Sequence, residues 1–253
     1  PSSTYNGDRM PIQRRTFAIQ TLATLIANSA WAQNLGNTLN FMVPQPPGNP
    51  TDTLARRLQP GLQKSLNTNV VIENLPGAGG ALCVNKMLAY PAGTPVLMIA
   101  SQTESILTPL SVRAAKYTSD KLRPVLLVTK SPYILLGRPD LPARDYKELA
   151  AYASERQREK KPLTHGHIGN GSMIHLLGER LSRKAGYELT QVPYKGVPLA
   201  LQDLIGSQID LSFVPLSSVR DLSQTGKVKV YGTTSATVSS RLPEALPLSK
   251  QSP

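Results

Sequence analysis

The sequence predicts an α/β fold of two domains, and three observations support this prediction. Short apolar runs that suit buried strands alternate with amphipathic runs that suit helices. The stretch 125–136 is almost continuously extended in pattern, which makes it a candidate crossing between domains. A second round of alternation begins at Thr164. We therefore expect a first domain at 34–127, a second at 128–235, and a return to the first domain, left incomplete, at 236–253.

The first domain should contain a helix with leucines every four residues from 54 to 66, which places them on one face. Thr51 or Asp52 is expected to cap this helix, and Pro60 to kink or break it near Leu58. The expected strands here are 39–44, 70–72 and 96–100, with a second helix at 81–89.

The second domain should begin with a helix at 144–158. Its other expected helices are 174–184 and 198–205, and its strands are 164–168, 189–193, 209–213 and 228–231. The chain then ends in a proline-studded tail without a regular pattern.

The composition argues against a disordered chain and against a nucleic-acid partner. The 253 residues are 40% hydrophobic, enough for real cores, and a single cysteine excludes an internal disulfide. The net charge is +12, but aromatic residues make up only 5% and the basic residues are spread along the chain. The densest charged run, 155–161, alternates with acids and suits a solvated helix end. The charge therefore favours a small anionic ligand.

The N-terminus has the three parts of a secretory signal peptide at 10–32, and 1–9 are upstream residues before Met10. Arg14 and Arg15 form the basic head, 17–27 the apolar middle, and 30–32 the small-x-small end. This predicts a periplasmic protein of a Gram-negative bacterium. The arginine pair leaves general secretory and twin-arginine export both open.

Three loops each follow an expected strand and lead toward a helix. Ligands of open α/β sheets sit outside the carboxyl ends of strands, where helix N-termini present free N–H groups and positive charge to a carboxylate. Taken singly, each loop also suits an ordinary capped turn. The candidate ligand residues are Pro47, Gly48, Asn49, Thr51, Asp52, Ser101, Gln102, Gly169, Asn170, Gly171 and Ser172.

Five ordered motifs resemble those of extracytoplasmic solute receptors for tripartite tricarboxylate transporters, the Bug-type receptors. Residues 46–52 resemble the family segment PPGGPTD, and residues 71–80 resemble VVENRPGAGG. Residues 169–176, which include His175, resemble GNGS…HL. Residues 192–196, which include Tyr194 and Lys195, resemble VPYKG, and residues 206–211 resemble GGQVDL. The likeness runs from about Leu39 to Pro247.

The resemblance implies a type II periplasmic binding protein-like fold, with two α/β domains and a ligand cleft between them. It implies a monomeric receptor without cofactor that binds a mono-, di- or tricarboxylic acid and delivers it to the membrane subunits of a tripartite transporter. It adds His175, Tyr194 and Lys195 to the candidate ligand residues. Asn49 replaces the second glycine of the family segment, and Val214-Pro215 stands where many members have an acid, which favours a ligand without an ammonium group. The family continues for several more elements, so a non-functional truncated receptor is an alternative.

Other functions have weaker support in the sequence. The glycines at 77–80 lack the third glycine and the acid of a dinucleotide site. His165, His167 and His175 could hold a metal, but strand-surface and helix-packing histidines explain them better. A hydrolase acting on a small carboxylate ester is the main enzymatic alternative. It lacks a G-x-S-x-G elbow, and Cys83 suits an apolar core better than a nucleophile.

Expression of the chain in a Gram-negative host tests the leader. The mature protein should begin near Gln33 and be recovered from the periplasm, because the peptidase cleaves after Ala32. N-terminal sequencing measures this, and an intact leader on soluble cytoplasmic protein would contradict the prediction.

Overall fold

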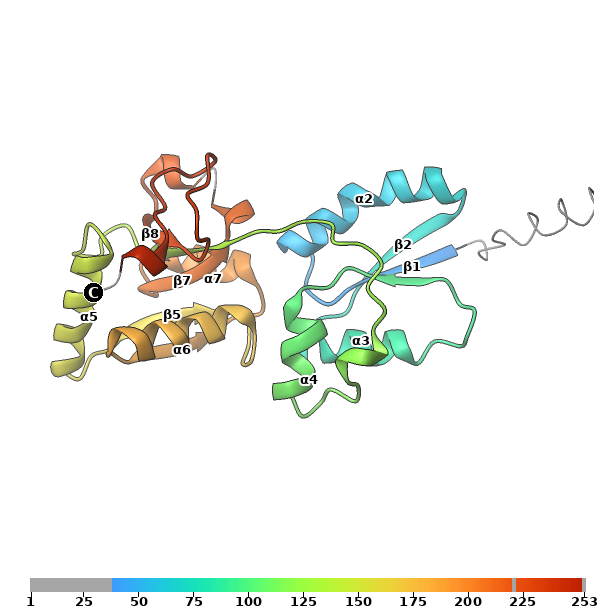
Figure 1. The fold of residues 1–253 in the computed structure, drawn as a ribbon, viewed down its shortest axis with the longest axis horizontal. Coiled ribbons are helices and arrows are strands. Elements are labelled where there is room, and N and C mark those ends of the chain that lie inside the picture. The colour runs from blue at the N-terminus through green and yellow to red at the C-terminus, as the bar shows by residue number, and fades with distance from the viewer. Residues whose placement is uncertain (1–37, 220–221, 252–253) are drawn as a thin grey trace, which may run out of the picture.

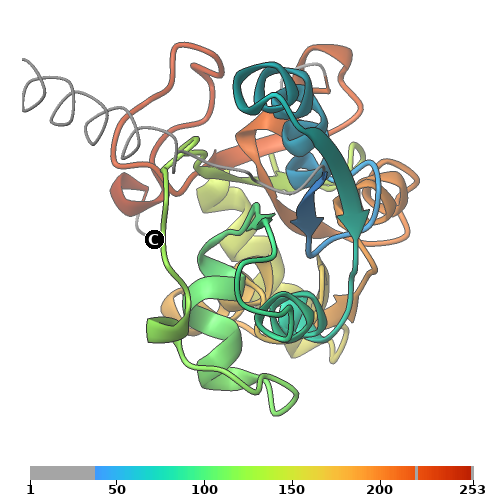
Figure 2. The ribbon, with the colours of Figure 1, turned by 90° about the vertical axis from the view of Figure 1, so that its right-hand side faces the viewer.

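The computed structural model describes residues 38–219 and 222–251, which form two lobes joined by an irregular strap (Figure 1). The predicted leader lies outside these residues. In the first lobe, β1 (Thr38–Val43) lies between β2 (Asn69–Asn74) and β3 (Val96–Met98), and all three strands are parallel. α2 (Pro50–Leu66) and α3 (Ala81–Leu88) lie on opposite sides of this sheet (Figure 2).

α2 begins earlier than predicted and is not interrupted. Its N-cap is Asn49, and Asp52 lies in its first turn rather than at the cap. The predicted break near Leu58 is wrong, since the helix continues through Pro60 to Leu66. Pro60 is exposed, so water can hydrate the carbonyl group that loses its donor.

The second lobe is a five-stranded mixed sheet in the order β6-β5-β7-β4-β8. β5 is parallel to β6 and β7, while β4 is antiparallel to β7 and β8. The expected strand at 209–213 lies two residues later, because pairing with β4 and β5 begins only at Leu211. The strands are β4 (Tyr133–Gly137), β5 (Leu163–His167), β6 (Leu189–Pro193), β7 (Leu211–Pro215) and β8 (Lys229–Thr233), and the helices α5 (Tyr146–Arg158), α6 (Met173–Ala185) and α7 (Val197–Ile205).

Two connecting segments differ from the sequence-based expectation. Residues 125–128 form no strand and are exposed, because no described strand pairs with them. The described part of the tail, 236–251, packs on the second lobe instead of returning to the first. Leu242 and Ala245 belong to the second lobe's core, and Thr233 donates its N–H to the carbonyl of Leu246.

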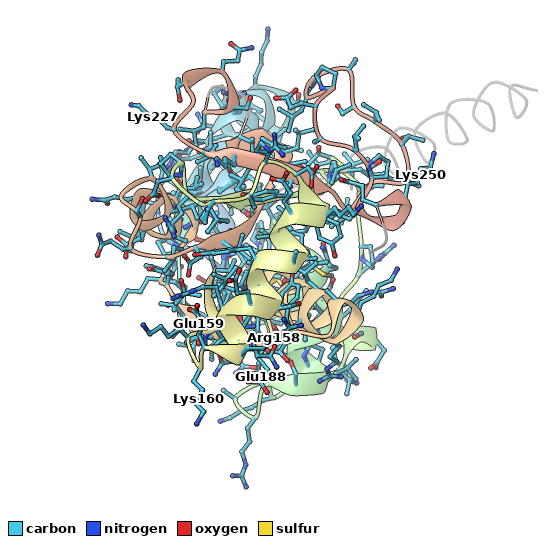
Figure 3. All side chains as sticks on the ribbon, turned by 90° about the vertical axis from the view of Figure 1, so that its left-hand side faces the viewer. Arg158, Glu159, Lys160, Glu188, Lys227 and Lys250 are labelled. Atoms are coloured by element: carbon cyan, nitrogen blue, oxygen red, sulfur yellow. The ribbon has the colours of Figure 1, made fainter. Side chains whose placement is uncertain are left out.

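Each lobe has its own core, and the second is the larger. Leu39, Phe41, Val43, Val70 and Ile99 are buried in the first lobe, together with Ala55 of α2. The charged end of α5, with Arg158, Glu159 and Lys160, lies on the outer face of the second lobe beside Glu188 (Figure 3). This confirms the interpretation of the run 155–161 as a solvated helix end.

His165 and His167 are buried rather than on the strand surface, because α6 covers their face of β5. Gly178 of α6 makes this packing possible, since a Cβ atom there would lie 2.5 Å from the His165 ring. His165 Nδ1 donates to the Gln191 side-chain oxygen at 2.8 Å. Burial lowers the pKa of His165 from 6.5 to about 4.

The depressed pKa of His165 predicts acid sensitivity. Neutral His165 contributes its full share to the free energy of unfolding above pH 6.5, and this share is lost as the pH falls toward 4. The reason is that, as the pH falls, the unfolded state binds a proton at a higher pH than the folded state does. The loss for this group amounts to about 3 kcal/mol. His165→Asn, which keeps a donor for Gln191, should flatten the free energy of unfolding between pH 7 and 4. Equal pH slopes for both proteins in urea titrations would contradict the assignment.

Candidate functional site

The loop after β1 is shaped by the carboxylate of Asp52. Asp52 Oδ2 accepts hydrogen bonds from the Gly48 backbone N–H at 2.9 Å and from Arg56 Nε at 3.0 Å. Asp52 Oδ1 accepts a hydrogen bond from Asn74 Nδ2 at 2.9 Å. Burial alone would raise the pKa of Asp52, but the bonds from Arg56, Gly48 and Asn74 hold it below its ordinary value. Asp52 therefore supports this loop and has no oxygen left without a donor.

The loop after β5 is organised by two histidines. Gly169 N–H donates to His167 Nδ1 at 3.1 Å, and Gly171 N–H donates to His175 Nδ1 at 3.3 Å. Both rings therefore carry their proton on Nε2. Ser172 is the N-cap of α6 and accepts the His175 N–H at 3.3 Å. Gly169 and Gly171 have φ values of 119° and 78°, which suit glycine.

Each of the two loops makes contact with the opposite lobe. Asn49 Oδ1 accepts the N–H of Val197, the first residue of α7, at 3.1 Å. The N–H of Met173, the first residue of α6, points to Thr103 Oγ1 at 3.4 Å.

A Cβ atom on Gly171 would lie 2.7 Å from Ser111 Oγ, which belongs to the short helix α4 (Thr108–Ser111) of the first lobe. The predicted loops at 47–52 and 169–172 thus lie at one junction.

The junction gathers the N-termini of α2, α6 and α7. Each N-terminus carries backbone N–H groups without a partner inside the helix and about half a positive charge. The start of α7 lacks a side-chain cap of its own, and its bond to Asn49 comes from the other lobe. Such a cluster of donors and positive ends favours a carboxylate or another small anion.

Some predicted ligand residues are used elsewhere or lie at the margin. The Tyr194 hydroxyl donates to Asp203 at 2.7 Å, on α7. Thr51 Oγ1 donates to Gln45 at 2.6 Å, and Gln102 hydrogen-bonds Tyr133 at the lobe junction. The remaining members are exposed, namely Pro47, Asn170 and Lys195.

A buried acid at the junction was missed in the sequence. Glu104 is 2% exposed and lies where β1, the turn 77–80 and β3 end. One oxygen accepts both the N–H and the hydroxyl of Ser101, at 2.8 and 2.7 Å. Burial raises the pKa of Glu104 above its ordinary value, although these bonds oppose the shift. The signal available in the sequence was an acid in the short polar segment between the apolar runs 96–100 and 106–107.

Little in the described residues supports catalysis or metal binding. Cys83 is buried as expected, and burial raises the pKa of its thiol to about 12. The Ser172 hydroxyl accepts an N–H as a helix cap, and no histidine of the described residues accepts its proton. Within 38–219 and 222–251, no three His, Cys, Asp or Glu side chains could hold a metal ion. No helix of these residues is long and apolar enough to span a membrane.

Two α/β lobes that meet through their strand ends and helix starts define the bilobed fold of the periplasmic binding protein class. A family model described as "Tripartite tricarboxylate transporter family receptor" matches residues 54–251. The chain belongs to this receptor family, the group with Bug-type members that the motifs predicted.

Two curated relatives show how much of the family protein is represented. A UPF0065 protein of Bordetella pertussis is 30% identical over 217 residues, which cover 85% of this chain and 66% of that protein. BugT of the same organism is 29% identical over 208 residues, which cover 81% of this chain and 63% of BugT. The chain thus spans slightly less than two thirds of the length of these relatives.

Solved structures show the same architecture. MatC (Rpa3494) from Rhodopseudomonas palustris with bound malate has a TM-score of 0.77 at 28% identity, covering 84% of this chain and 72% of MatC. R. palustris Rpa4515 with adipate has a TM-score of 0.78 at 27% identity, covering 84% of this chain and 71% of that protein. These similarities confirm the predicted fold class.

Glu104→Gln should stabilise the protein at neutral pH. Because the pKa of Glu104 is raised, its contribution to stability is present below about pH 4.5 and is lost as the pH rises through the folded-state pKa. Glutamine keeps the oxygen that accepts from Ser101 and cannot ionise. The free energy of unfolding of the variant should exceed that of wild type by more at pH 8 than at pH 4.5. The exposed Glu188→Gln is the control, and the same pH trend in both variants would refute the assignment.

Proposed function

We propose that this chain is a receptor that captures a small organic carboxylate in the periplasm and delivers it to a tripartite tricarboxylate-type membrane transporter. The observation that carries the proposal is the meeting of the α2, α6 and α7 N-termini at the lobe junction, linked by the Asn49–Val197 hydrogen bond. A carboxylate at this junction would gain from the positive ends of the helix dipoles and from the Ser172 hydroxyl without a paired arginine.

Several features support a carboxylate rather than another solute. The net charge of +12 attracts anions over a distance. Two similar solved proteins hold malate and adipate, which are carboxylates. Val214, at the position where many members have an acid, is fully buried in β7 and offers no partner for an ammonium group. Both the N–H and the hydroxyl of Ser101 already donate to Glu104, so that acid belongs to the framework of the lobe.

The residues proposed to hold the carboxylate are those whose backbone or hydroxyl groups lie at the junction. In the first lobe they are Gly48 and Thr51, and in the second Gly169, Gly171 and Ser172. The N–H groups of Gly48, Gly169 and Gly171 and the Thr51 hydroxyl donate within the protein, so these residues shape the loops around the acid. The Ser172 hydroxyl accepts the His175 N–H and keeps its own hydrogen for the carboxylate. We propose that the two lobes close over the acid by a hinge in the strap 124–132, which excludes water from the charged groups. Delivery requires contact with the membrane subunits of the transporter. The family to which the chain belongs is the support for naming them as partners.

Gly171→Ala should weaken carboxylate binding about threefold, because its Cβ atom would lie 2.7 Å from Ser111 Oγ and force that side chain to turn away from the Leu107 carbonyl at the contact between the lobes. Gly186→Ala is a matched control, since Gly186 has a similar φ (75° against 78°) but open space around it. Both variants should lose about 1 kcal/mol of stability from the left-handed backbone. Calorimetry with mono- and dicarboxylic acids measures the affinities.

If Gly171→Ala and Gly186→Ala bind an acid with equal affinity, and wild type also binds that acid, the Gly171 loop is not part of the binding site. Thermal stabilisation of wild type by nucleotides or by amino acids, and not by plain carboxylic acids, would contradict the ligand class.

A further inference from the structure

Asn49 is a buried polar residue whose side chain reaches from one lobe to the other. It is 1% exposed, and its Oδ1 accepts the Val197 N–H at 3.1 Å across 148 positions of sequence. Its Nδ2 donates to the carbonyl of Pro46 at 3.2 Å. The bond to Pro46 fixes which end of the amide is which, so the oxygen faces the start of α7.

Apart from the Val197 N–H, the first residues of α7 offer few hydrogen-bonding groups. Gly196, the N-cap, has no side chain to cap the helix, and Pro198 has no N–H. The Val197 N–H is therefore the foremost donor of this nine-residue helix. The amide oxygen of Asn49 takes the place in which a carboxylate oxygen would be favoured by the helix dipole.

Gly196 is matched to Asn49 by shape. A Cβ atom on Gly196 would lie 2.6 Å from Asn49 Nδ2, which leaves no room for any side chain. The backbone of Gly196 is extended, with φ 179°, a value that any residue can adopt. The glycine is therefore required here for space and not for conformation.

We infer that Asn49 is a specificity-determining residue. Its amide occupies the start of α7, so the site holds acids with one carboxylate in preference to dicarboxylates of the same chain length. This inference rests on the proposed function. The single carboxylate takes the hydrogen of the Ser172 hydroxyl, which accepts the His175 N–H and still has its own hydrogen to donate. A second carboxylate would find the Val197 donor already taken and Asn49 in its way.

Asn49→Gly tests the inference, because glycine keeps a good N-cap and removes the amide. The probes are chain-length pairs, butyrate with succinate and hexanoate with adipate, measured by calorimetry. The variant should gain about tenfold in affinity for the dicarboxylates, the value of one hydrogen bond to a charged group, and change less than about twofold for the monocarboxylates. Asn67→Gly, at the other end of α2 with φ 47°, is the matched control and should keep the wild-type preference.

The possible results separate the inference from the proposed function. The ratio of the affinity for a monocarboxylate to that for the matching dicarboxylate decides the inference. If this ratio is the same in wild type and in Asn49→Gly, the inference is wrong and the proposed function stands. Failure of every acid to bind either protein would overturn both. If Asn49→Gly does not unfold cooperatively, Asn49→Ala removes the same amide and is judged by the same ratio.

Discussion

The convergence of helix N-termini at one junction organises this structure. In the first lobe, parallel strands end on the side that meets the second lobe, and the helix that follows β1 starts there. In the second lobe, β5 and β6 end toward the same junction and are followed by α6 and α7. A connection that returns to a parallel strand must begin its helix at the strand's carboxyl end. The positive ends of helices from two separate sheets therefore meet where the lobes touch.

The protein meets much of this donor capacity with its own groups. Asp52 accepts from Gly48, the rings of His167 and His175 accept from Gly169 and Gly171, and Asn49 accepts from Val197. Buried donors need partners, and these internal acceptors fix the loop shapes. A receptor built in this way presents a preformed set of groups, which lowers the ordering cost of binding. The identity of each internal acceptor also decides which donors remain for a ligand, so specificity can lie in residues that support the loops.

The two lobes differ in how they are stabilised. The second has the larger core, to which the segment 236–251 contributes Leu242 and Ala245. The first has a smaller core on a three-stranded sheet. The strap residues Val125, Leu126 and Leu127 are at least 68% exposed, and they connect the lobes without anchoring either sheet. This leaves the junction contacts, above all Asn49 with Val197, as the described groups that relate one lobe to the other.

The sequence by itself determined the alternation of strands and helices, the α/β class and the three loops at strand ends, because periodicity and turn residues are local properties. Its motifs also identified the receptor family. Only the tertiary structure decided that 125–128 has no pairing strand, that the tail packs on the second lobe, and that His165 and His167 are buried under α6. It also revealed Glu104 in a buried position and placed the Asn49 amide on the start of α7. Each of these depends on contacts between residues far apart in the chain, for which local pattern carries no signal.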